Sequence, residues 1–368
     1  MNSIRLVKPY ITFDEVESEF RDVFESGIFT RGQNIEELRK YLTDYTGSKH
    51  AFLMTSATTA LWISLKLLGV CKGDEVIVSD FSYPASANVI EDLGATPVFA
   101  DVDLNTFNML PSELESKITE KTKAVMFVDA LGNPTGVIEI KAICDKYKLT
   151  LIEDAACAIG SSENGRRCGS IADLTCFSFH PRKLISSGEG GAITLNRDDW
   201  ADWLEVKLFH GARGLKGLAL DHIDFGYNFR LPELQAIMAI KQLAKIEAIV
   251  EERNRIRADY IAQLKPLGFI PQQIGKYVRY NVQSLVFKVP KGCDRDSLIL
   301  RLRNMGVEST IGTYALSSGT YYARKYADQQ KNSCKLEQTT ITLPCFEGVD
   351  VSRVVSCIKL AIESFKNE

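Results

Sequence analysis

The sequence predicts an α/β fold in which a mostly parallel sheet is flanked by helices, followed by a smaller α+β domain. Two patterns predict this fold class. Short β-branched runs alternate with helix-like stretches over the first 200 residues, and such alternation is typical of a parallel sheet covered on both faces. From residue 230 to residue 264, apolar residues instead recur every three or four positions and predict one long helix.

The first pattern divides into individual elements. Buried strands are predicted where an apolar run is bounded by polar residues or turn formers. Ligands of such sheets lie beyond the carboxyl ends of the strands, so the residues that follow each strand are the candidates for a site. The predicted strands are 74–80, 96–102, 123–129 and 149–155, and the predicted helices between them include 58–68, 84–93 and 136–147.

The second pattern begins the C-terminal domain. Pro232 fits the first turn of the long helix. A strand-like run, a helix-like run, a second strand-like run and a last helix from Val351 follow it. We therefore predict a large domain over residues 1–245 and a small α+β domain over residues 246–368.

Composition excludes several classes of protein. Hydrophobic residues make up 45% of the chain and charged residues 25%, as in ordinary globular enzymes. A formal net charge of −3 gives no basic face for nucleic acid, and no apolar run is long enough to cross a membrane. The first residues lack an apolar signal-peptide core. Nine cysteines without CxxC spacing indicate reduced thiols in a cytoplasm and no metal site.

Four strand ends carry unusual groups. Small residues at Ala57 and Thr58 open a helix whose N–H groups could hold an anion, although small residues also cap helices for structural reasons. Tyr83 could stack on a flat ligand or simply pack at a rim. Asp154 needs either a backbone cap or a cationic partner. Lys183 precedes the glycine-rich "SSGEGG", although most lysines are solvated surface residues.

Together these groups match the needs of one cofactor. Pyridoxal phosphate requires an anion cradle, a ring stack, a carboxylate on its pyridine nitrogen and a lysine amine that forms a Schiff base and moves a proton. The order cradle, stack, carboxylate and lysine along one α/β chain is more specific than any single member. We expect burial and nearby positive charge to lower the pKa of Lys183, because the attacking amine must be neutral.

Beyond these groups, the chain resembles a known family. The stretches "SATTAL", "EDAACAIGS", "FSFHPRKLISSGEGGAI", "GYNFRLPELQAIMA" and "GVESTIGTYAL" are similar to those of the DegT/DnrJ-type nucleotide-sugar aminotransferases, which belong to the aspartate aminotransferase fold group. The resemblance covers nearly the whole chain and implies the three-layer fold of the PLP-dependent transferases. It also implies homodimers with shared active sites that move an amino group from L-glutamate to a nucleotide-linked keto-sugar.

The resemblance assigns a role to each matching residue. It implies that Lys183 binds the cofactor covalently, that Asp154 pairs with the pyridine nitrogen and that Tyr83 stacks on the ring. Asn228, in "GYNFR", corresponds to the residue that reaches the phosphate of the other subunit. The phosphate is expected to contact Ala57, Thr58 and Ser178 in addition.

The chain departs from the family pattern at three places. Cys157 stands where histidine or glutamine commonly bonds the phenolic oxygen of the cofactor, and a thiol is a weaker donor. Asp129 stands where histidine is frequent. Ser317 and Ser318 follow "GTYAL", where many members carry a histidine, so no sugar contact is carried over there.

The expected substrate is a 4-keto-6-deoxyhexose, because "SFHPRK" and "GYNFRLPELQ" look more like carbon-4 than carbon-3 members. The pathway implied is the synthesis of an amino sugar, such as one in the O-antigen of a lipopolysaccharide. Three alternatives remain at this point. They are a 3-keto-sugar aminotransferase, a PLP-dependent sugar dehydratase with histidine in place of the lysine, for which His180 lies nearby, and a non-catalytic PLP-binding regulator.

Overall fold

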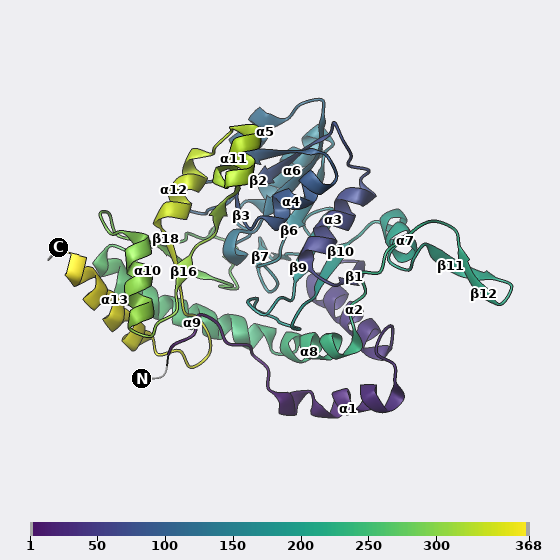
Figure 1. Cartoon of the computed structure of the whole chain (residues 1–368), viewed down its shortest axis with the longest axis horizontal. Helices are drawn as coiled ribbons and strands as arrows, with labels where there is room; N and C mark the ends of the chain where they lie inside the picture. Colours follow the sequence, from purple (N-terminus) through teal and green to yellow (C-terminus); the bar gives the residue numbers. More distant parts are fainter. Residues whose placement is uncertain (1–2, 366–368) are drawn as a thin grey trace.

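The structure, a computed structural model, describes residues 3–365 and is built around a seven-stranded sheet (Figure 1). Its strand order is β1-β10-β9-β6-β5-β2-β4. Only β10 runs antiparallel to its neighbours within this sheet, so the predicted mostly parallel sheet is confirmed. The strands are β1 (His50–Met54), β10 (Gly191–Leu195), β9 (Leu174–Ser178), β6 (Thr150–Asp154), β5 (Thr122–Val128), β2 (Glu75–Ser79) and β4 (Thr96–Ala100).

Helices cover both faces of this sheet because successive strand residues point to opposite sides. Val76 and Val78 pack in the same core as α3, α4 and α7, whereas Ile77 packs with α5 and α6. At the β1 end, α2 and α8 cover that second face. These helices are α3 (Ala57–Leu67), α4 (Ala85–Asp92), α7 (Asp198–Lys207), α5 (Pro111–Lys117), α6 (Val137–Tyr147), α2 (Gln33–Thr46) and α8 (Glu233–Leu243).

The prediction of one long helix from residue 230 to residue 264 is wrong. Two helices occupy this stretch, α8 and then α9 (Ile246–Leu264), and Pro232 is the residue before the first of them. The backbone of Lys245, between them, leaves the helical conformation with φ −107° and ψ 3°. The break has a packing reason: α8 buries its apolar face against the large sheet, whereas Tyr260 and Leu264 of α9 belong to a separate core.

That separate core surrounds a second sheet of four antiparallel strands in the order β13-β15-β18-β16. Ile4 joins this core from the N-terminal end of the chain. The sheet and its helices are β13 (Ile270–Pro271), β15 (Leu285–Lys288), β18 (Thr340–Leu343), β16 (Thr310–Ile311), α10 (Arg295–Asn304) and α13 (Val351–Phe365).

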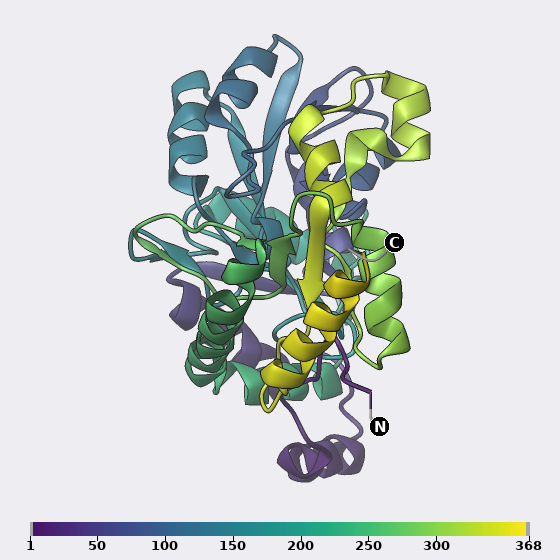
Figure 2. The same cartoon turned by 90° about the vertical axis from the view of Figure 1, so that its left-hand side faces the viewer.

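One segment of the C-terminal part packs back on the large sheet. It contains α11 (Thr320–Tyr326) and α12 (Lys331–Thr339), which Figures 1 and 2 show beside the helices of the large sheet. Leu316 and Tyr322 lie in the core of α3 and α4. The division into domains at residue 245 stays a prediction, since both Ile4 and this segment pack across it.

A hairpin formed by β11 (Ala212–Lys216) and β12 (Ala219–His222) extends away from the body of the molecule, at the right of Figure 1. Its tip and the segment after it carry exposed apolar side chains, among them Leu215, Leu218 and Phe225. On the lower side of the same view lies α1 (Glu17–Ser26).

Within residues 3–365, none of the helices combines the length and apolar character that crossing a membrane requires. The remaining short strands are β3 (Phe81–Ser82), β17 (Tyr314–Ala315), β7 (Ser162–Glu163), β8 (Arg166–Arg167) and β14 (Val278–Arg279).

Candidate active site

A cavity of about 570 Å³ opens at the carboxyl edge of the large sheet. This size is typical of small-molecule sites. The second sheet closes its other side through residues such as Leu285 and Thr342. Asn228 is not among the residues that line it. The other predicted site residues do line it: Ala57, Thr58, Tyr83, Asp154, Cys157, Ser178 and Lys183.

Lys183 lies in a turn after β9, where its amide donates to the carbonyl of His180 at 2.8 Å. Its amine Nζ lies 3.0 Å from the sulfur of Cys157, which follows β6. These two residues meet because β6 and β9 are adjacent parallel strands. The cavity therefore holds an amine and a thiol in direct contact at its base.

The expected lowering of the pKa of Lys183 is wrong for this structure. Burial pulls the pKa of the amine down, but Cys157, Asp154 and Tyr83 together outweigh burial and raise the pKa above its ordinary value. Positive charge does not contribute to this shift. Lys183 is therefore an ammonium group at neutral pH, and it must lose a proton before it can act as a nucleophile.

Two glutamines that the sequence gave no reason to single out hold the loop of Lys183. The Leu184 amide donates to Oε1 of Gln283 at 2.5 Å, and Nε2 of Gln283 donates to the carbonyl of Arg182 at 2.7 Å. On the other side of the loop, Gln242 of α8 bonds both the amide and the carbonyl of Ser186. Gln283 lies in a run that reads only as a strand, so no sequence signal marked it.

Asp154 is 6% exposed at the end of β6. Its Oδ2 accepts a hydrogen bond from the Ser86 hydroxyl at 2.7 Å, and its Oδ1 accepts one from the Ala156 amide at 3.2 Å. Burial raises the pKa of this carboxyl, while Ser86, Ala156 and the Lys183 ammonium oppose the rise. The sequence left open whether Asp154 caps a backbone amide or meets a cationic partner. Asp154 does cap the Ala156 amide, and its carboxyl group also lines the cavity. Ser86 was not predicted, because a serine early in α4 reads as an ordinary helix residue.

The N-terminus of α3 has the open amides that the predicted anion cradle requires. Ser56 caps the helix by accepting from the Thr59 amide at 3.1 Å, which leaves the earlier amides, those of Ala57 and Thr58, without an intrahelical acceptor. The helix can begin this close to β10 because Gly191 has no side chain. A Cβ at this position would lie only 2.6 Å from the Ala57 nitrogen. Unpaired amides and the helix dipole both favour an anion such as a phosphate.

Ser178 and Tyr83 complete the walls of the cavity. Ser178, the last residue of β9, accepts a hydrogen bond from the His180 amide at 3.3 Å through its hydroxyl. The Tyr83 ring is 66% exposed and stands edge-on to Tyr314, with 6.1 Å between ring centroids. Its ring is thus free to stack on a planar ligand.

Comparison with known proteins assigns this arrangement to a family. The model of the "DegT/DnrJ/EryC1/StrS aminotransferase family" matches residues 11–359, most of the chain.

The chain belongs to the DegT/DnrJ/EryC1/StrS aminotransferase family.

Individual relatives agree with this assignment. The GDP-perosamine synthase of Vibrio cholerae is 32% identical over 347 residues, which are 92% of this chain and 94% of that protein. Spr1654 of Streptococcus pneumoniae, described as a sugar aminotransferase and solved in a PLP form, is 27% identical, with a TM-score of 0.92 and 99% of each chain covered. A family aminotransferase from Brucella abortus is 28% identical, with a TM-score of 0.87 over 94% of this chain and 95% of that one.

The predicted family, its PLP-transferase fold and its dependence on pyridoxal phosphate are thereby confirmed. The residues of this aminotransferase fit the cofactor: the open amides of α3, a buried carboxyl and a lysine amine line one cavity. When bound, pyridoxal phosphate supplies an electron-withdrawing ring that stabilises negative charge on the substrate carbon.

At position 317, where the resemblance led us to expect a histidine in many members, the serine of this aminotransferase has a structural role. Ser317 is buried and donates to the Asp80 carboxylate through its amide at 2.7 Å and its hydroxyl at 2.9 Å. Burial raises the pKa of Asp80 to about 7, although the bonds from Ser317 oppose the rise. Ser317 thus attaches the segment of α11 and α12 to the large sheet and does not line the cavity.

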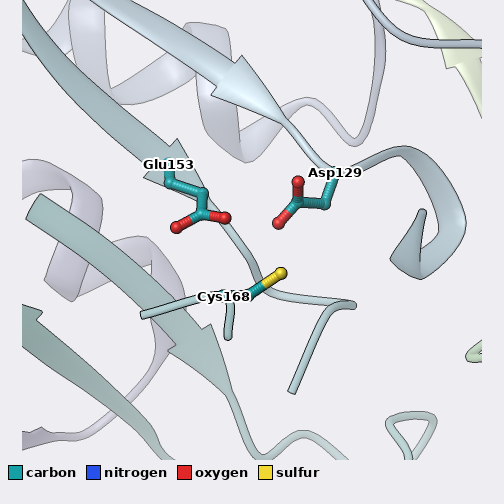
Figure 3. Close-up of side chains that lie close together, drawn as sticks. All are labelled: Asp129, Glu153 and Cys168. Carbon is teal, nitrogen blue, oxygen red and sulfur yellow. The ribbon is translucent and has the colours of Figure 1, made fainter. Parts of the chain in front are cut away.

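At position 129 the departure creates a buried acidic cluster. Figure 3 shows the carboxyl groups of Asp129 and Glu153 pointing toward one another, with the Cys168 sulfur close by. The ligand atoms of the three residues lie within 4.8 Å of one another. One oxygen of Glu153 accepts from Thr175 at 2.7 Å, whereas both oxygens of Asp129 lack a partner. Burial and the adjacent Glu153 charge raise the pKa of Asp129 well above its usual range.

This pKa predicts a pH-dependent effect of Asp129→Asn on stability. An unfolded aspartate titrates near pH ~3.9, so the favourable contribution of protonated Asp129 is complete below that pH and is lost as the pH rises toward the higher folded pKa. The free energy of unfolding of the wild type should therefore fall relative to that of Asp129→Asn, by at most about 1.4 kcal/mol per pH unit. Urea unfolding of both proteins between pH 4.5 and 8 measures this difference. A difference that stays constant across the range would contradict a raised pKa.

Proposed function

We propose that this aminotransferase transfers the amino group of L-glutamate to a nucleotide-linked keto-sugar, a 4-keto-6-deoxyhexose. The observation that carries the proposal is one cavity that joins the Lys183 amine, the Asp154 carboxyl and the open N-terminus of α3 in a chain of this family. The GDP-perosamine synthase of Vibrio cholerae, at 32% identity, supports a nucleotide-linked sugar as the acceptor.

Each residue has a proposed task. Lys183 holds the cofactor covalently and moves a proton at the substrate carbon that bears the amino group. Asp154 keeps a proton on the pyridine nitrogen, and Ser86 orients Asp154 for this contact. The amides of α3 and the Ser178 hydroxyl bind the phosphate. Tyr83 stacks on the ring, and Cys157 lies beside the amine.

The mouth of the cavity suits anionic substrates. Exposed Arg182 lines it on the loop of Lys183, and both L-glutamate and a sugar nucleotide carry negative charge that a guanidinium binds in a bidentate manner. His180 lies at the same mouth, 3.9 Å from Glu189. A dehydratase with histidine in the lysine position does not match this arrangement, because Lys183 occupies the base of the cavity.

A panel of substrates tests the proposal. The purified enzyme is supplied with L-glutamate and with 4-keto and 3-keto sugars linked to GDP, UDP or dTDP, and the products are analysed by mass spectrometry. We expect one 4-keto sugar nucleotide to be converted to its amine and glutamate to be converted to 2-oxoglutarate. Amination of only the 3-keto sugars would move the reaction to carbon 3, and a complete lack of amino-sugar product would refute the proposal.

We also propose that the enzyme is a homodimer with shared active sites. Asn228 is exposed and lies outside the cavity of its own chain, although it corresponds to a phosphate-binding residue. It follows directly after the projecting hairpin, whose Leu218 is fully exposed. A second copy that covers these apolar side chains would bring Asn228 to the neighbouring cavity, and burial of that surface would stabilise the dimer.

Mixing two inactive variants tests this sharing. Lys183→Ala and Asn228→Asp are mixed after partial denaturation and refolded together. If sites are shared, each heterodimer has one site with both lesions and one wild-type site, so activity returns to about a quarter of the normal level when half of the dimers are mixed. Mixing Lys183→Ala with Asp154→Asn is the matched control, since both residues come from one chain and no wild-type site can form. Equal, negligible recovery in both mixtures would contradict a shared site.

The cellular setting is part of the same proposal. All nine cysteines are free thiols, which fits a protein of the reducing cytoplasm. There the amino sugar would be made on its nucleotide carrier for a polysaccharide such as the O-antigen of a lipopolysaccharide.

A further inference from the structure

The contact between Lys183 and Cys157 permits a chemical reaction other than transamination. The amine nitrogen lies 3.0 Å from the sulfur, and both side chains line the open cavity, where Cys157 is half-buried. Small solutes can therefore reach the sulfur. A glutamine or histidine at position 157 would offer no sulfur at this place.

In the structure the sulfur of Cys157 contacts the amine and forms no disulfide. All nine cysteines are free in the structure, and Cys144, Cys168 and Cys176 are buried in the two faces of the large sheet. Cys345 also lines the cavity but is 1% exposed. Among the described residues, the only side-chain hydrogen bond to the Cys157 sulfur comes from Lys183.

We propose that Cys157 and Lys183 form a reversible covalent cross-link when the enzyme meets hydrogen peroxide. The peroxide first oxidises the thiol to a sulfenic acid and releases one water. A sulfenic acid can condense even with a backbone nitrogen to a sulfenamide, and an amine is a better nucleophile than an amide. The neutral Lys183 amine then attacks the sulfur, the S–N bond forms, the S–O bond breaks, and the hydroxyl leaves with an amine proton as a second water. One peroxide is thus reduced to two waters, while the thiol and the amine together lose two hydrogen atoms.

The cross-link would inhibit transamination, and this consequence rests on the proposed function. It consumes the amine that holds the cofactor, and the site stays blocked until a thiol reductant attacks the sulfur and releases both side chains. The cross-link requires a free Lys183 amine. The enzyme that carries the aminated cofactor can therefore form it, whereas covalent attachment of the cofactor to Lys183 prevents it. A higher pH should speed the condensation, because a lysine ammonium must lose a proton before its nitrogen can attack.

Peptide mass spectrometry tests the cross-link. Enzyme loaded with pyridoxamine phosphate is treated with hydrogen peroxide, digested without reductant and analysed for joined peptides. We expect a pair joined through Cys157 and Lys183 that has lost two hydrogen atoms, and we expect dithiothreitol to separate it. Cys157→Ser and Lys183→Arg should each lack the pair, and in Lys183→Arg the sulfur of Cys157 should proceed to the sulfinic acid.

Three results would overturn the proposal. They are oxidation of wild-type Cys157 to the sulfinic acid without a joined pair, a joined pair that persists in Cys157→Ser, and a bridge that retains an oxygen atom. The readout does not depend on activity. A joined pair in an enzyme that fails to aminate any sugar would leave the cross-link standing and remove only the proposed function. Equal cross-linking with and without prior attachment of pyridoxal phosphate would show that Lys183 does not hold the cofactor.

Discussion

Lys183→Ala is expected to abolish transamination completely. Alanine has no amine to hold the cofactor and no group to move the proton, and loss of both functions costs more than loss of a single contact. The N-terminus of α3 remains, so the variant should still bind the aminated cofactor through its phosphate. The wild-type chain, incubated with pyridoxal phosphate and reduced with borohydride, should gain the mass of one cofactor on Lys183.

The same reduction should leave the variant unmodified. Exposed Lys276 provides the matched control, because Lys276→Ala removes a lysine that does not line the cavity and should still gain one cofactor. Modification of any other lysine in the wild-type protein would contradict the assignment of Lys183.

Asp154→Asn should have the second largest effect, a fall in rate of several orders of magnitude with the fold intact. The asparagine oxygen can still accept from the Ala156 amide, and its NH2 group can donate to the Ser86 hydroxyl, so the local structure is kept. It cannot balance the positive charge of a protonated pyridine ring, and a single electrostatic contact of this kind is commonly worth about 10²–10³ in rate. Rates are measured with L-glutamate, and circular dichroism and thermal unfolding verify the fold.

Ser86→Ala is the matched control for that experiment. It removes one hydrogen bond to Asp154 but leaves the carboxylate charge, so we expect a loss of about tenfold, which corresponds to one hydrogen bond of roughly 1–1.5 kcal/mol. If Asp154→Asn lost no more than this, Asp154 would serve only as the acceptor for the Ala156 amide.

The parts of the fold and site that depend on local patterns were predictable from the sequence. Alternating apolar runs located β2, β4, β5 and β6, and parallel strands bring their carboxyl ends to one edge. This rule placed Asp154 and Lys183 in the same cavity although they are far apart in the chain. The anion cradle was predictable for the same reason, since α3 follows directly after β1.

The parts that depend on packing between distant segments were not predictable. The break at Lys245 follows from two separate cores, which the uninterrupted apolar period of residues 230–264 does not reveal. Gln283 and Ser86 are ordinary residues until the fold places them against the Lys183 loop and Asp154. The raised pKa of Lys183 depends on which groups face the amine, and that was unknown before the structure.

Gln283 has a consequence for how new members of such a family can arise. It reaches the Lys183 loop from the C-terminal half of the chain and bonds the backbone on both sides of the lysine, at Arg182 and Leu184. A chimaera that joined this N-terminal half to the C-terminal half of a relative would replace that support together with the substrate-facing wall. The two halves are therefore not interchangeable modules, and a recombinant should recover efficient turnover only where the donor supplies an equivalent side chain at this point.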